Sequence, residues 1–352
     1  MLKQKSQPKN KFQIKAKGKA KIKDKKRTSP KITATSQQLQ PLVKGDLIDI
    51  VAPGSSTDPA VLQKACAILQ SWGYRTRVAS DLMKPQLFLS NSDSYRFKSL
   101  KKALLAKDSK AVWCLRGGYG SIRLVPYLSK LEKPQHKKLL IGLSDITTLQ
   151  IFLAQKWNWP SVHGPLLDRI GLESLPTENQ QELKALLEGN LLKTEWHGLK
   201  PLNKAAEKSK RLDGAVTGGN LVVVTSSLGT PIQINADHKI LFLEELNERG
   251  YRIDRCLQQL DQAGVFNRVQ AVILGDFLKC HEPDGSDISF QTLQEFFKTR
   301  KVPAFYGLPL GHGIQQRPLV FNTKATITAK SIDQSQFTML VCSPYEVFKP
   351  RK

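Results

Sequence analysis

The sequence predicts an α/β protein with two folded domains behind a basic tail. At 352 residues the chain is long for a single hydrophobic core. After the first 43 residues, short apolar strands alternate with helical patterns, which indicates a parallel sheet covered on both faces. Further on the pattern is mixed and richer in strands. We therefore expect a tail (1–43), an α/β domain (44–190), a linker (191–212) and a β-rich C-terminal domain (213–352).

The tail carries half of the formal net charge of +24. Its first 36 residues hold twelve lysines, one arginine and one aspartate, a net +12. With few large apolar residues this segment cannot fold by burying surface, so we expect it to be disordered. It is either a polyanion-binding arm that acts through counterion release, although it lacks aromatic residues spaced for stacking on bases, or a solubilising extension.

Several patterns favour a cytoplasmic protein. No apolar run approaches the roughly 20 residues that cross a bilayer, and the basic start has no apolar stretch behind it. The five cysteines are odd in number and lack the close pairs typical of zinc sites, so we expect them to be reduced.

The alternation in the first domain begins at residue 44. Helical spacing of apolar residues, β-branched runs and turn residues place the boundaries. The expected strands are 47–51, 74–80, 111–117 and 138–142, and the expected helices are 61–72, 95–106, 121–131, 146–155 and 177–189. Ligands are expected at the carboxyl ends of such strands.

The following 23 residues, 193–215, are polar and basic without clear periodicity, which favours a linker. The C-terminal domain then shows strands and helices in mixed order. The expected strands are 239–245, 269–277, 324–330 and 337–342, and the expected helix is 251–264.

A glycine loop, "LRGGYGS" (115–121), follows the third strand of the first domain. It has neither the ending of a phosphate loop nor the spacing of a dinucleotide fingerprint. Adjacent glycines let the backbone approach a ligand and aim N–H groups at it, which suits an oxyanion hole. A plain tight turn is the alternative.

Ser144 stands where the strand "KLLIG" gives way to a helix. A strand–turn–helix serine is typical of the nucleophile elbow, in which the next N–H, here that of Asp145, helps to bind an oxyanion. No glycine follows two places later, and a helix N-cap is the alternative.

His312 lies between two glycines in "LPLGHGIQQ", an arrangement that leaves an imidazole accessible. A nucleophilic serine needs such a base, and the base needs an acid to orient it. Glu244 and Glu245 both end the apolar strand "KILFLEE" and are candidates for that acid. His163, in "SVHGP", is expected to be a structural or substrate-side histidine.

The ordered set "AVWCLRGGYGSIRLVPYL", "LIGLSDITTL", "VHGP", "GGNL", "LFLEE…YRIDR" and "GHG" resembles the LD-carboxypeptidase family of serine peptidases. The resemblance covers roughly residues 44–342. It implies Ser144 as the nucleophile, Glu244 as the orienting acid and His312 as the base. The backbones of Gly118 and Asp145 match the oxyanion donors. Where the family is expected to have aspartate after the acid, this chain has Glu245.

The resemblance also implies an architecture and an activity. It implies a flavodoxin-like N-terminal domain, a swivelling C-terminal domain and a homodimer, with no metal or organic cofactor. The implied substrate is a cytoplasmic muropeptide that loses its terminal D-alanine in cell-wall recycling. Because that substrate ends in a carboxylate, a basic pocket is expected. Arg116 and Asn220 are the candidate substrate contacts, and a structural ion pair is the alternative for Arg116. Two alternatives stay open: a microcin-immunity type of peptidase acting on a peptide–nucleotide conjugate, and a polyanion-binding protein acting through its tail.

Overall fold

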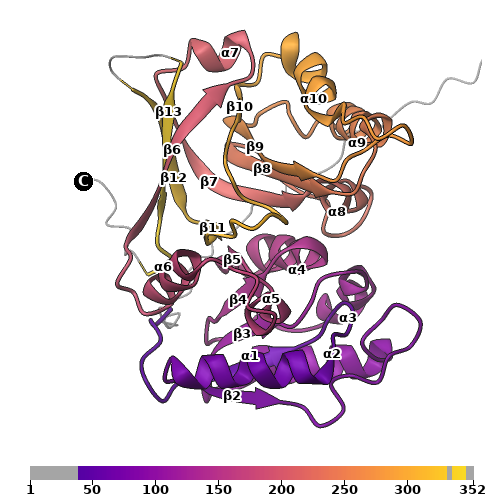
Figure 1. Cartoon of the computed structure of the whole chain (residues 1–352), viewed down its shortest axis with the longest axis vertical. Helices are drawn as coiled ribbons and strands as arrows, with labels where there is room; N and C mark the ends of the chain where they lie inside the picture. Colours follow the sequence, from indigo (N-terminus) through magenta and orange to yellow (C-terminus); the bar gives the residue numbers. More distant parts are fainter. Residues whose placement is uncertain (1–38, 331–334, 346–352) are drawn as a thin grey trace, which may run out of the picture. The chain divides into compact units, whose positions relative to one another are not determined.

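The computed structural model describes residues 39–330 and 335–345 (Figure 1). Most of the expected disordered tail therefore lies outside the described residues. Its last part does not behave as a tail, because Leu39 and Leu42 are 6% and 2% exposed and belong to the hydrophobic core. The Leu42 N–H also donates to the carbonyl of Leu187 at 2.8 Å. The folded chain thus begins about five residues before the expected boundary.

The first part of the chain builds a sheet of six strands in the order β11-β5-β4-β3-β1-β2. Its strands are β1 (Leu47–Val51), β2 (Arg75–Val78), β3 (Ser109–Cys114), β4 (Leu139–Gly142), β5 (Ser161–His163) and β11 (Leu319–Phe321). Strands β1 to β5 pair in parallel, in the 2-1-3-4-5 order of flavodoxin-like folds. The predicted parallel α/β domain is confirmed. Strand β11 joins β5 antiparallel from a distant part of the sequence.

Helices cover both faces of this sheet. They are α1 (Pro59–Ser71), α2 (Asp93–Leu105), α3 (Val125–Leu128), α4 (Thr147–Phe152), α5 (Leu167–Gly171) and α6 (Thr177–Leu187), with the short turns η1 (Ser121–Leu124), η2 (Ser144–Ile146) and η3 (Leu153–Trp157). Side chains of β3 alternate between the faces: Trp113 packs in the cluster that contains α1, α5 and α6, and Val112 in the cluster that contains α2, α3 and α4. Burial on both sides explains the continuous apolar strands.

The rest of the chain forms a closed seven-stranded barrel, in the order β10-β6-β13-β12-β7-β8-β9. Its strands are β6 (Lys193–Pro201), β7 (Arg211–Asn220), β8 (Lys239–Leu246), β9 (Ala271–Leu278), β10 (Ala304–Tyr306), β12 (Lys324–Ala329) and β13 (Phe337–Cys342). The associated helices are α7 (Lys204–Glu207), α8 (Leu221–Ser226), α9 (Gly250–Gln262) and α10 (Ser289–Lys298). In Figure 1 the orange helices α9 and α10 lie beside β8 and β9.

The segment expected to be a linker is instead structured. Strand β6 pairs with β13 and β10, and α7 follows it. In β6 the residues Thr194, Trp196 and Leu199 are buried, and the polar residues between them are exposed or half-buried. These polar residues dominate the sequence and obscure the alternation. The linker prediction is therefore wrong for residues 193–201, which complete the barrel.

Strand β7 of the barrel reaches the part of the first sheet that carries Ser144 and α4. The backbone N–H of Asn220, the last residue of β7, donates to Thr147 Oγ1 of α4 at 3.2 Å. Gly219 lies so close to Thr147 that a Cβ there would stand 2.3 Å from Thr147 Oγ1. The carboxyl end of β7 is thus held beside the turn that follows β4.

Candidate active site

Ser144 sits in the turn between β4 and α4 with a left-handed backbone, at φ 65°. Few residues other than glycine adopt this conformation, and where they do, the surrounding structure holds them there. The half-buried serine has no side-chain capping hydrogen bond in η2. The geometry is that of a strand–turn–helix elbow and differs from the helix N-cap that was the alternative.

The glycine loop lies directly against this serine. A Cβ on Gly117 would stand 2.8 Å from Ser144 Cβ and 3.0 Å from its Oγ, so only glycine fits there. Gly118 adopts φ 83°. Among the described residues, the N–H groups of Gly118 and Asp145 have no protein acceptor. Both residues line the same cavity as Ser144, so these N–H groups are candidates for an oxyanion hole.

The side chain of Asp145 has a structural task. Its carboxylate is 4% exposed and accepts hydrogen bonds from the N–H groups of Gly120 at 3.2 Å and Ser121 at 2.9 Å. Burial raises the pKa of this carboxyl, against the lowering effect of those hydrogen bonds. Asp145 thereby fixes the glycine loop to the serine turn.

His312 is hydrogen-bonded to Glu244: Nδ1 lies 2.7 Å from Glu244 Oε2. The glutamate side chain is fully buried and the histidine side chain is 14% exposed. Burial alone would lower the pKa of His312, but the charge and hydrogen bond of Glu244 outweigh it, so that pKa is raised. A histidine hydrogen-bonded to a buried carboxylate is the arrangement that serine hydrolases use to activate a serine.

The glycines on either side of His312 make room for two carboxylates. A Cβ on Gly311 would stand 3.0 Å from Glu244 Oε2, and a Cβ on Gly313 would stand 2.8 Å from Asp276 Oδ2. Burial, followed by the charge of Glu244, raises the pKa of Asp276 to about 6. Asp276 was not identified from the sequence, where its position in "LGDF" resembles any strand end.

Glu245 points away from His312. Its carboxylate accepts from Asn220 Nδ2 at 2.8 Å, from Val222 N at 2.9 Å and from its neighbour Leu246 N. Burial raises the pKa of Glu245 to about 7. The Oδ1 of Asn220 also caps α8 at Val223 N. The protein thus holds the Asn220 side chain at both polar atoms, and each of these atoms keeps one further hydrogen-bonding position.

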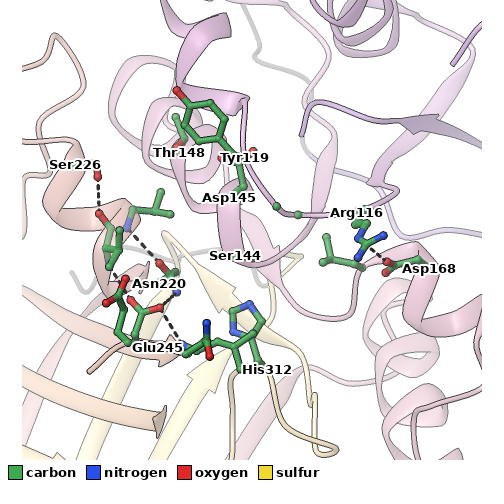
Figure 2. A pocket seen from close by; sticks show the side chains of 18 of the residues that line it. Arg116, Tyr119, Ser144, Asp145, Thr148, Asp168, Asn220, Ser226, Glu245 and His312 are labelled. Carbon is green, nitrogen blue, oxygen red and sulfur yellow. Dashed lines mark hydrogen bonds and ion pairs between the residues drawn. The ribbon is translucent and has the colours of Figure 1, made fainter. Parts of the chain in front are cut away.

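Ser144, His312 and the glycine loop line one cavity of about 690 Å³. Figure 2 shows Ser144 between Asn220 and Glu245 on one side and Arg116 and Asp168 on the other. Arg116 Nε lies 3.7 Å from Asp168 Oδ2, and its Nη1 donates to the Ser56 carbonyl. The other lining residues include Tyr119, Ile122, Thr148, Leu166, Arg169, Leu172, Val222, Val223, Ser226, Leu246, Asn247 and Glu248.

His163 is a core residue and does not line this cavity. It is 0% exposed and packs against Phe242 and Phe321, with ring centroids at 5.2 and 5.4 Å. Burial lowers its pKa to about 4, so it is neutral. The structural reading of His163 fits these contacts.

A serine in a strained elbow, a coupled His–Glu pair and two free N–H groups around one cavity are the features of a serine hydrolase. Two family models match the chain: an LD-carboxypeptidase N-terminal domain over residues 48–164 and an LD-carboxypeptidase C-terminal domain over residues 213–327. The chain belongs to the LD-carboxypeptidase family and is a serine-type carboxypeptidase.

Similar proteins span almost the same length. A putative carboxypeptidase of Rickettsia conorii is 37% identical over 81% of this chain and 89% of its own. A murein tetrapeptide carboxypeptidase of Pseudomonas aeruginosa is 30% identical over 80% of this chain and 92% of its own. The crystal structure of a muramoyltetrapeptide carboxypeptidase from Oxalobacter formigenes matches with a TM-score of 0.70 at 27% identity, covering 84% of this chain and 98% of that one.

Proposed function

We propose that the protein is a serine L,D-carboxypeptidase that removes the terminal D-alanine from murein tetrapeptides. The observation that carries the proposal is the 2.7 Å contact between His312 and buried Glu244, in a cavity that Ser144 also lines. A buried carboxylate on Nδ1 fixes the tautomer, which leaves Nε2 to act as a base.

The reaction follows from the residue types. His312 takes the proton of Ser144, and the alkoxide attacks the carbonyl before the terminal residue. The N–H groups of Gly118 and Asp145 stabilise the oxyanion, and Glu244 stabilises the imidazolium. His312 then protonates the leaving amine, and water releases the acyl group from Ser144 by the same steps in reverse order.

The relatives named above support the choice of substrate, since two of them are named for a tetrapeptide of the cell wall. A cytoplasmic role in peptidoglycan recycling and a homodimer belong to the same proposal. No helix of the described residues is long and apolar enough to cross a membrane.

A peptide–nucleotide conjugate is the alternative substrate and needs an aromatic slot for its base. Tyr119 is the single Tyr, Phe or Trp among the described residues that line the cavity, and it is 45% exposed. One exposed ring cannot enclose a base between two faces. The cavity therefore favours the peptide.

The decisive experiment is mass spectrometry of the tetrapeptide incubated with the wild-type protein and with Ser144→Ala. We expect the wild type to release D-alanine and the variant to lose roughly 10⁴- to 10⁶-fold in kcat with its fold intact. Equal turnover by the variant would remove the nucleophile. A folded wild type that leaves the tetrapeptide intact would direct the search to other peptide conjugates.

A further inference from the structure

Arg169 is a cation of the candidate active site whose guanidinium lacks a hydrogen-bond partner among the described residues, although the charge of the neighbouring Asp168 interacts with it at longer range. It lines the same cavity as Ser144 and His312. Its Nε is buried without a hydrogen-bond partner. Over the described residues, its guanidinium makes no hydrogen bond and no ion pair within 4.0 Å. An unpaired buried donor destabilises the protein, and a ligand that pairs with it recovers that free energy.

Most other charged side chains of the cavity have a protein partner, although Asp168 Oδ1 is also buried without a hydrogen-bond partner. Arg116, the second arginine there, donates to the Ser56 carbonyl and lies near Asp168. Glu248 pairs with Arg252 at 3.4 Å, and Glu245 accepts three hydrogen bonds. Arg169 is thus the cation of the cavity that is left to a substrate.

The fold places Arg169 close to the reacting groups. Strands β4 and β5 are parallel neighbours, with Gly142 opposite His163. Ser144 follows the end of β4, and α5, which carries Arg169, follows the end of β5. Arg169 is also near enough to His312 that its positive charge, after the larger effect of burial, opposes the rise in the pKa of that histidine.

The chemistry of a carboxypeptidase says which substrate group belongs there. His312 must protonate the leaving amine, so the leaving residue lies beside the imidazole. Its free carboxylate is separated from that amine by a single carbon atom, about 2.5 Å away by standard geometry. A guanidinium fits a carboxylate with two parallel hydrogen bonds.

We propose that Arg169 binds the C-terminal carboxylate of the leaving residue and so restricts the enzyme to the end of the peptide. This inference rests on the proposed function and deepens it. It assigns a substrate contact to Arg169, which the sequence did not single out, beside the expected contacts Arg116 and Asn220.

Binding to an inactive background tests the inference without turnover. The ligands are a tetrapeptide ending in D-alanine and the same peptide ending in D-alaninamide, measured by calorimetry on Ser144→Ala. We expect the acid to bind roughly 10- to 100-fold more tightly than the amide. Adding Arg169→Gln should bring the two affinities within about threefold of each other, and Arg169→Lys should restore part of the preference.

The matched control is Arg75→Gln in the same background, which makes the same change of charge on β2, where Arg75 donates to the Gly45 carbonyl. It should keep the full preference. The inference is overturned if Arg169→Gln keeps the preference, if it weakens acid and amide equally, or if the parent shows none. Turnover of the acid by the wild type is scored separately: preserved preference without turnover would count against the proposed function alone.

Discussion

Ser144 holds φ at 65°, a backbone conformation that costs a residue with a side chain about 1–2 kcal/mol. Contacts on both sides hold it there: Gly117 packs against its side chain, and Asp145 ties the glycine loop to the same turn. The strain presents Oγ to the cavity and leaves the N–H groups beside it without protein acceptors. The strained backbone of Ser144 lowers the stability of the fold but keeps the serine side chain accessible from the cavity, and such strain is common at functional sites.

The family resemblance pointed to Ser144, Glu244 and His312 as partners. The residue types alone did not choose between the adjacent glutamates Glu244 and Glu245. Side chains alternate along a strand, so only one of Glu244 and Glu245 can face His312, and the sequence does not say which face that is. Arg169 was missed for a different reason. An arginine in a short helix is ordinarily solvated, and only the three-dimensional structure reveals that it lacks a partner.

Removing the charge of Glu244 should change the pH dependence of the reaction. In the proposed mechanism neutral His312 is the base, so kcat/KM should rise as the pH passes upward through the pKa of His312. That pKa is raised above its ordinary value of 6.5, so the acid limb of the wild type should lie above pH 6.5. In Glu244→Gln, burial remains and lowers the pKa of His312, so the limb should fall below 6.5 while kcat drops roughly 10²- to 10⁴-fold.

The pH profile of kcat/KM measures this shift, and Glu245→Gln is the matched control. Glu245 does not contact His312, and its charge affects that pKa less than the charge of Glu244 does. The control should move the limb less. An unchanged limb in Glu244→Gln would show that another group orients the base.

At the scale of elements, the sequence predicted the longer strands that are buried on both faces, but it did not predict the short or irregular strands. Strand β3 is a continuous apolar run because helices cover both of its faces. Strand β6 alternates buried and exposed residues only until Gly198, where the alternation is interrupted. This short and mostly polar pattern led to the wrong prediction of a linker. Strand β11 has three residues and carries too little pattern to be recognised.

The contact between β7 and α4 should be the most sensitive junction between elements of the site. Gly219→Ala would place a methyl group 2.3 Å from Thr147 Oγ1, at a φ of 130°. We expect it to lower the free energy of unfolding by roughly 2–4 kcal/mol and to reduce turnover, because Thr147 immediately follows the nucleophile turn η2. Urea denaturation and D-alanine release measure the two effects.

Gly229→Ala is the control that separates the effect of the steric clash with Thr147 from the effect of a side chain at a positive φ. Gly229 also has a positive φ, at 73°, but a Cβ there meets nothing within 4 Å. It should cost about 1–2 kcal/mol and leave turnover unchanged. Equal losses from the two substitutions would mean that the contact with Thr147 does not matter.

At the scale of the whole molecule, length and alternation predicted the α/β class and a second β-rich part. They could not predict that the barrel closes, because closure depends on pairings between distant strands such as β6 and β13. Nor could they place the start of the folded chain, since Leu39 and Leu42 are two isolated leucines in a polar context.

Two truncations test where the folded protein begins. Deleting residues 1–36 should leave turnover and Tm unchanged, because every contact described for the site is made by residues after Leu39. The deletion should also abolish any salt-sensitive binding of polyanions by the tail. Deleting 1–43 removes Leu39 and Leu42 from the core, at about 1.5–3 kcal/mol for each buried leucine, and should lower Tm by several degrees. Calorimetry of the two truncated proteins measures Tm and tests whether only the longer deletion lowers it. A fall in turnover after the shorter deletion would give the tail a part in the reaction.

Strand β11 also sets an order of events during synthesis. The edge of β5 pairs with residues 319–321, which a ribosome adds more than 150 residues after His163. At 5–20 residues per second the wait is roughly 8 to 30 s, during which that edge is open to pairing with other chains. A similar stretch of 168 residues separates Ser144 from His312, so a nascent chain carries the proposed nucleophile long before it carries the proposed base.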